Sequence, residues 1–226
     1  YHAWLYKNGF NVDAPNPTND VVAPYYGVKP LWKTPYSQFV RSEITIGRTW
    51  VFGRNSGQAI ATRLLAGAGF AYGNSSALPF EKHFYGGGAN SLRGWQARTV
   101  GPGCSPRDTS FVIPNQTGDM KLEANIEYRF DMFWKVAGAV FVDAGNVWTL
   151  NKESSDEMSV FRWNNLGESL AVNWGTGVRL NLGFLLLRVD MGMKIHDPAR
   201  EQKWVSPGRW LNRDNYALHF GVGYPF

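Results

Sequence analysis

Strict alternation of apolar and polar residues runs through much of the 226-residue chain. In residues 121–130 every even position is apolar and every odd position is charged or an amide, as expected for a β-strand with two unlike faces. Helical periodicity is nearly missing, so the pattern predicts an all-β chain. The predicted strands are 38–53, 58–72, 121–130, 135–148, 172–182, 185–194 and 216–226, with an eighth if residues 1–7 also form one.

Alternation alone fits two kinds of antiparallel β protein. In a soluble β-sandwich the apolar face packs on a core, whereas in a transmembrane barrel it faces lipid and the polar face lines the lumen. The predicted strands have about 10–16 residues. Strands of soluble proteins cluster near 5–6 residues, while a tilted membrane strand needs about 9–11. Strand length therefore favours the barrel, and a soluble all-β domain remains the alternative.

Connections and aromatic residues support the barrel. Short turns are predicted at 54–57, 131–134 and 181–183, and long loops at about 8–36, 73–117, 149–170 and 196–214. Outer-membrane barrels alternate in this way between tight periplasmic turns and long outer loops. Aromatic residues near predicted strand ends suit a membrane-interface girdle; they are Trp50, Phe52, Phe130, Phe133, Trp148, Tyr216, Tyr224 and Phe226. If Phe226 lies at the periplasmic side, every long loop faces outward.

Seven or eight strands would close only a minimal barrel. An open sheet leaves two unpaired edges, which are costly in lipid. The chain also starts at Tyr1, without a Met or a signal peptide. We therefore expect residues 1–226 to be the C-terminal portion of a larger barrel domain, completed by upstream residues or by another chain.

Composition excludes several other classes. The net charge of +5 and 44% hydrophobic content exclude wholesale disorder. Cys104 is the only cysteine, so a disulfide scaffold is impossible, and one Cys with four His leaves little for a structural zinc site. Basic residues are scattered, so no nucleic-acid partner is expected. Common hydrolase, metalloprotease, P-loop and thiol-redox motifs are absent from the sequence. No catalytic residue, metal or cofactor is predicted.

The long loop 73–117 carries the most distinctive residues. It contains Phe84-Tyr85-Gly86-Gly87, followed by Asn90-Ser91-Leu92-Arg93-Gly94-Trp95. A later strand carries Phe141-Val142-Asp143-Ala144-Gly145, and the last strand ends in Phe226. Over about residues 37–226, these motifs resemble the BamA/TamA superfamily of outer-membrane assembly barrels, which has a [V/I/L]-R-G-[F/Y/W] loop and an F-x-D-x-G strand. The run Gly101-Pro102-Gly103 is most similar to the TamL/BamA branch.

The resemblance implies a fold, a location and partners. The fold would be an antiparallel transmembrane β-barrel, with this chain supplying the last seven or eight of 16 strands and no POTRA domain. The location would be the bacterial outer membrane. The function would be non-enzymatic insertion or translocation of outer-membrane proteins, with outer-membrane lipids, client proteins and periplasmic or lipoprotein accessory subunits as partners. The alternatives are a passive pore or uptake barrel and the barrel domain of a patatin-like lipase.

The resemblance also places the long loop inside the barrel lumen, where Arg93 needs partners. The alternation puts Asp143 and Glu127 on the polar face. Because a guanidinium donates bidentate hydrogen bonds that an ammonium cannot reproduce, we expect Arg93 to pair with Asp143 and Glu127. Gly94 would permit close backbone approach and Trp95 would pack against the barrel wall. Other residues are expected only as general lumen charges: Glu123, Arg129, Arg179, Arg188, Asp190 and Lys194.

The last predicted strand is weak. Gly221 and Gly223 remove two side chains from its polar face, and Pro225 cannot donate a ladder hydrogen bond. A weak last strand paired with the first strand would form a seam that opens at low cost. In the resembled family such a lateral gate templates a client strand by strand addition. Phe226 also fits a simpler role as an assembly signal.

Overall fold

The computed structural model describes residues 30–31, 34–35, 37–53, 57–73, 75–106, 116–150 and 156–226. The possible strand at 1–7 and most of the predicted loop 8–36 lie outside the described residues. Residues 42–68 and 83–226 form one compact unit that holds most of the sheet, and a second unit comprises residues 1–41 and 69–82.

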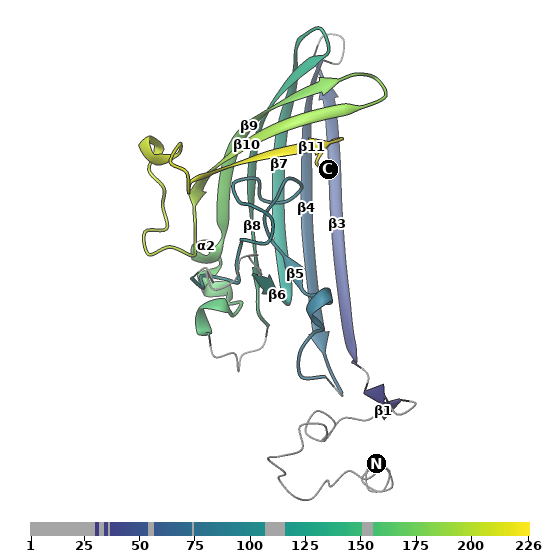
Figure 1. Ribbon diagram of the computed structural model, residues 1–226, viewed down its shortest axis with the longest axis vertical. Helices are drawn as coiled ribbons and strands as arrows, with labels where there is room; N and C mark the ends of the chain where they lie inside the picture. The colour runs from purple at the N-terminus through teal and green to yellow at the C-terminus, as the bar shows by residue number, and fades with distance from the viewer. Residues whose placement is uncertain are drawn as a thin grey trace, which may run out of the picture. The chain divides into compact units, whose positions relative to one another are not determined.

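Seven long strands form one sheet in the order β11-β10-β9-β8-β7-β4-β3 (Figure 1). They are β3 (Phe39–Phe52), β4 (Gln58–Ala71), β7 (Met120–Phe133), β8 (Val136–Trp148), β9 (Ala171–Asn181), β10 (Leu186–His196) and β11 (Tyr216–Val222). Every neighbouring pair from β4 to β11 is antiparallel. The seven long predicted strands are all present. Among the described residues the sheet is open, with β3 and β11 at its edges.

Short elements occupy the connections. Two short antiparallel pairs of two residues a strand are formed by β1 (Pro30–Leu31) with β2 (Thr34–Pro35) and by β5 (Phe84–Tyr85) with β6 (Thr117–Gly118). The single-turn helices are η3 (Phe80–Lys82), η4 (Glu157–Ser159), η5 (Trp163–Asn165), α2 (Leu166–Ser169) and η6 (Pro207–Arg209). Within the described ranges, no helix combines the length and apolar character needed to cross a membrane.

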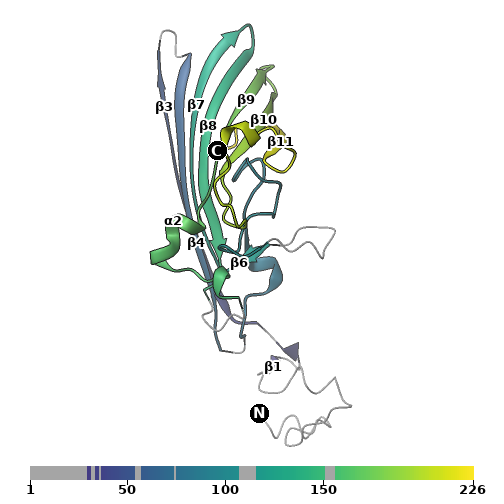
Figure 2. The same ribbon diagram turned by 90° about the vertical axis from the view of Figure 1, so that its left-hand side faces the viewer.

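Burial along the strands is the reverse of that in a soluble sheet. In β7, Glu123 and Glu127 are buried while Ile126 is 56% exposed. In β8, Asp143 is buried while Val142 is 45% exposed. The polar face is covered by the loop that follows β5, which overlaps β7 and β8 in Figure 1 and lies to one side of them in Figure 2. This arrangement matches a barrel wall with a polar lumen and does not match a soluble sandwich.

Turn positions differ from those predicted. The predicted turn at 131–134 is wrong, because β7 continues through Phe133 and the turn is formed by Trp134 and Lys135. A register shift between Asp131 and Phe133 breaks the alternation there, which hid the end of the strand from the sequence pattern. The next turn follows Asn181 and includes Gly183 at φ 91°, a left-handed conformation that favours glycine. Most of the turn at 54–57 lies outside the described residues.

Two aromatic placements are also wrong. The strand predicted to run through Phe226 ends at Val222, and Gly223 then adopts φ 80°. The chain therefore turns, and Phe226 leaves the lipid-facing row of Phe220. Trp148, expected at the membrane interface, is only 1% exposed, because its indole donates to the hydroxyl oxygen of Ser169 in the following loop at 3.1 Å.

Candidate functional site

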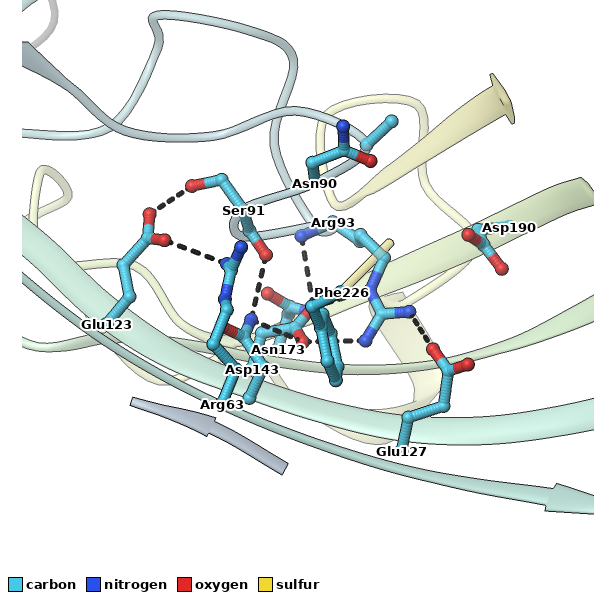
Figure 3. Close-up of polar contacts among 12 residues, drawn as sticks. Arg63, Asn90, Ser91, Arg93, Glu123, Glu127, Asp143, Asn173, Asp190 and Phe226 are labelled. Carbon is cyan, nitrogen blue, oxygen red and sulfur yellow. Dashed lines mark hydrogen bonds and ion pairs between the residues drawn. The ribbon is translucent and has the colours of Figure 1, made fainter. Parts of the chain in front are cut away.

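The side chain of Arg93 is fully buried against the polar face of the sheet (Figure 3). Its Nε and Nη2 donate to the two carboxylate oxygens of Asp143 at 3.0 and 2.8 Å, and its backbone N–H donates to the same carboxylate at 3.1 Å. Its Nη1 forms an ion pair with Glu127. The structure thus brings together the three residues that the sequence singled out, and their role in function stays a proposal.

Strand register holds Asp143 in position. Asp143 on β8 lies opposite Asn125 on β7 and opposite Asn173 on β9, so the three form a row across the sheet. Each asparagine donates from Nδ2 to the carboxylate, at 2.9 Å from Asn125 and 3.0 Å from Asn173. Together with the three bonds from Arg93, the carboxylate accepts five hydrogen bonds. Its geometry is therefore determined before any partner binds.

Glu127 is surrounded by guanidinium groups. It pairs with Arg93, with Arg129 at 2.7 Å and with Arg179 at 3.1 Å. Arg179 also pairs with the buried Asp190 on β10. Because charges removed from water are tolerated only when paired and hydrogen-bonded, this network is what allows so many ionised side chains to be buried.

The loop backbone is attached to several strands. Asn125 donates to the carbonyl oxygen of Ser91 at 3.0 Å, while the Ser91 hydroxyl bonds to Glu123. Arg188 on β10 donates to the carbonyl oxygen of Ala89 at 2.9 Å. His219 on β11 donates from Nε2 to the carbonyl oxygen of Arg93 at 3.1 Å. The loop is therefore seated by contacts from β7, β8, β10 and β11.

We call the side chains that hold Arg93, namely Asp143, Glu127, Asn125 and Asn173, the seat. Small and aromatic residues complete it. A Cβ at Gly94 would meet the side chain of Asn173 at 2.6 Å, so only glycine permits this approach. Trp95 is buried in a cluster with Leu92, Val100 and Ala171. On β8, the ring of Phe141 lies under the Arg93 guanidinium, with Cζ 3.4 Å from its centroid. In the loop motif 92–95 and in the strand motif 141–145, uncharged residues therefore help to hold the loop as well as Arg93 and Asp143.

Gly145 explains the last position of the strand motif. A Cβ there would collide with the backbone of Leu122 and with Glu123 on β7. Glycine at this position keeps β7 and β8 in close contact beside the row that holds Asp143.

The electrostatics keep Arg93 charged. Burial by itself would lower the pKa of the guanidinium, but the hydrogen bonds and negative charges of Asp143 and Glu127 outweigh burial and raise the pKa of Arg93 above its ordinary value. The guanidinium of Arg93 therefore stays charged at physiological pH. In the described residues, no group of three or more His, Cys, Asp or Glu side chains is arranged to hold a metal ion.

The gate residues lie at the edge of the sheet. β11 pairs with β10 over Tyr216–Val222, and in the described part of the chain no strand pairs with its other edge. Gly221 lies against the guanidinium of Arg188. The Phe226 ring points back toward the cluster, with its centroid 5.7 Å from Cζ of Arg93. A lateral gate between the first and last strands stays a prediction.

Sequence reasoning missed part of the site. Asn125 and Asn173, which orient Asp143, were not singled out, and Arg179 and Asp190 were expected only as general lumen charges. Their signal was their phase, since all four lie on the polar face of their strands. The alternation shows that phase but does not show which residues stand opposite one another.

A family model described as the Omp85 superfamily domain matches residues 28–226. The chain belongs to the Omp85 superfamily. It is 28% identical over 157 residues to the outer membrane protein assembly factor BamA of Neisseria meningitidis serogroup B, covering 66% of this chain and 19% of that protein. The predicted likeness to the BamA/TamA family is confirmed, while the TamL-like branch stays a prediction.

Two solved structures are similar to this chain. BamA from Haemophilus ducreyi lacking POTRA domains 1–3 has a TM-score of 0.59 and 17% identity, covering 82% of this chain and 35% of that one. CdiB from Acinetobacter baumannii has a TM-score of 0.48 and 14% identity, with 82% and 27% coverage. The likeness to the BamA barrel confirms the predicted fold class, an antiparallel transmembrane β-barrel. This Omp85 chain spans about a fifth to a third of the length of these BamA proteins.

Proposed function

We propose that this Omp85 chain is the C-terminal part of a barrel that inserts, folds or translocates other proteins in the bacterial outer membrane. The observation that carries the proposal is the buried seat of Arg93, in which Asp143 and Glu127 hold the long loop against the polar face of the sheet. The likeness to a protein named as an outer membrane protein assembly factor supports the same function.

The seat favours assembly over passive conduction. A pore needs an open lumen, whereas here the loop covers the polar face of β7 and β8 and is anchored by ion pairs. The site residues are engaged in binding one another, and no covalent chemistry is needed for the proposed role. The proposed role is a conformational change of the barrel. The bound loop would keep the strands that it contacts in one register while a weakly paired edge of the sheet opens.

The weak edge is β11. It has seven residues, it includes Gly221, and its register pairs with β10 end at Val222, after which the N–H of Gly223 donates to the carbonyl oxygen of Leu186 at 2.8 Å. Such an edge can exchange its partner for a strand of a client protein by strand addition. Exposed apolar side chains on the other face of the sheet, such as Ile126 and Val142, would contact outer-membrane lipids. Client outer-membrane proteins and accessory subunits are the proposed partners.

The test uses the full-length protein that contains this chain, in cells depleted of the native copy. Arg93→Ala and Arg93→Lys are compared with Arg162→Ala, which removes an exposed arginine from an ion pair with Glu157. We expect both Arg93 variants to lower client folding, measured by heat-modifiable mobility of client barrels, at unchanged abundance of the variant itself. Lysine should not rescue, because it cannot donate to both oxygens of Asp143 and to Glu127.

Normal client folding with Arg93→Ala would contradict the proposal. Normal folding accompanied by altered single-channel conductance would instead favour the passive pore.

A further inference from the structure

The loop between β10 and β11, residues 197–215, returns to the lipid-facing side of the sheet (Figure 1, olive and yellow). The ring of Trp210 lies 5.1 Å from that of Trp174, centroid to centroid. Trp174 is on the apolar face of β9, since it alternates with the lumen-facing Asn173. Met193, its register partner on β10, is 7% exposed, whereas Val189 on the same face is 41% exposed. This loop therefore meets the lipid-facing surface where the strands end.

The tip of this loop combines apolar and cationic groups. We name residues 209–213, Arg-Trp-Leu-Asn-Arg, the interfacial segment. Leu211 is 72% exposed, and the flanking Arg209 and Arg213 are exposed as well. Neither arginine forms an ion pair with any residue that the structure describes. Tryptophan and leucine beside arginine suit the boundary between hydrocarbon and headgroups, where the cation can reach the polar layer.

Other cations of the same loop are already neutralised. Arg200 pairs with Asp197 at 3.0 Å, and Lys203 pairs with Glu168 at 3.1 Å. Arg209 and Arg213 are thus the cations of this loop that form no ion pair with a described residue, and the loop also carries Glu201 and Asp214 as carboxylates without an ion pair there. That contrast indicates an anionic ligand outside the protein for Arg209 and Arg213.

A cavity adjoins the segment and defines the chemistry further. Its volume is about 550 Å³, and Arg209 lines it together with the ion-paired Arg200, the amides of Gln202 and Asn212 and the hydroxyl of Ser206. Arg213 lies outside its lining. Asp214 contributes the one carboxylate among its lining residues. Guanidinium, amide and hydroxyl donors suit a phosphate group that carries further hydroxyls or amides. The volume lies within the range of about 300–1,000 Å³ that is typical of small-molecule sites.

We propose that the interfacial segment and this cavity bind the phosphorylated headgroup of an outer-leaflet lipid. The site lies on the loop that enters β11, so the bound lipid would sit beside the strand proposed to open. The proposal rests on the outer-membrane barrel of the proposed function and on the outward orientation of the long loops expected from the sequence, but it does not depend on client folding.

The experiment measures lipid binding by the full-length protein in zwitterionic nanodiscs. Three probes are titrated: bisphosphorylated lipid A, phosphatidylglycerol and water-soluble glucose 1-phosphate. The variant Arg209→Ala/Arg213→Ala is compared with Arg162→Ala/Lys203→Ala, which removes the same charge from residues that are ion-paired. From about 1 kcal/mol per cation near an anionic surface, the first variant should lose about 30-fold in affinity for lipid A. The control should retain wild-type affinity.

Each outcome is decisive. A loss restricted to Arg209→Ala/Arg213→Ala supports the site, whether lipid A or phosphatidylglycerol binds more tightly. Equal affinity in both double variants, or tight binding of glucose 1-phosphate without a preference for lipid, overturns it. Heat-modifiable mobility of the variants verifies that they are folded. Since Arg93→Ala tests client folding separately, failure of the lipid site and failure of the proposed function are distinguishable.

Discussion

Replacing Asp143 by asparagine should release the long loop from its seat. The substitution keeps the shape of the side chain and removes its charge. Both oxygens of Asp143 accept from donors, one from Arg93 and Asn125 and the other from Arg93 and Asn173. Whichever oxygen becomes an NH₂ group will therefore face donors. Arg93 keeps Glu127 as its remaining carboxylate partner.

The expected size of the effect follows from burial. Removing one partner of a buried ion pair costs about 3–5 kcal/mol, and the remaining Glu127 places this case at the lower end. A cost of about 3 kcal/mol raises the opening equilibrium of the loop at least about 100-fold, because 1.36 kcal/mol corresponds to a factor of ten. Amide exchange that proceeds through loop opening should accelerate by the same factor.

Hydrogen exchange followed by mass spectrometry measures this directly in the full-length protein. The loop amides to follow are those of Gly88, which donates to Trp95, and of Arg93, which donates to Asp143. Asp131→Asn, the same chemical change at an exposed carboxylate near the end of β7, is the matched control. Loop exchange in Asp143→Asn no faster than in this control would refute the argument that Asp143 holds the loop.

Two further predictions concern the same sheet. A Cβ at Gly192 would collide with the backbone carbonyl group of Arg93, so Gly192→Ala should destabilise the seat by about 1–3 kcal/mol and increase loop exchange, whereas Gly208→Ala, with nothing within 4 Å, should not. Ile126→Lys places a charge on the lipid-facing side of β7 and should lower the free energy of unfolding in lipid vesicles by about 2–4 kcal/mol, while Glu201→Lys in an exposed loop should have little effect. A denaturant titration that shows equal stabilities for these two lysine variants would argue against the membrane placement.

Alternation predicted the strands and their faces because a barrel wall repeats one simple constraint at every second residue. For the same reason it placed Asp143 and Glu127 on the face that receives Arg93. The prediction from alternation became inaccurate at the strand ends, where side chains no longer alternate between lipid and lumen. The turn after Phe133 follows a register irregularity, and Phe226 leaves the strand after a glycine in a left-handed conformation.

Contacts between distant segments could not be derived from the sequence. The position of Asn173 beside Asp143 depends on the register between β8 and β9, which alternation leaves undetermined in steps of two residues. The burial of Trp148 depends on Ser169 in the following loop, whose path has no periodic signal. The sequence therefore predicted the strands of the barrel wall from their alternation. It predicted the position of a loop only where that loop carries a recognisable motif.

Because Asn125, Asp143 and Asn173 come from three neighbouring strands, binding of the loop depends on the register of those strands. A slip of two residues between β8 and β9 would leave every polar side chain facing inward, so hydrophobicity alone would not penalise it. It would, however, put Ala171 or Gly175 opposite Asp143 in place of Asn173. Asp143 would then keep Arg93 and Asn125 but lose the hydrogen bond from Asn173. How firmly the loop is held therefore depends on the correct alignment of β8 with β9, and strand alignment is also what the proposed function would carry out on client proteins.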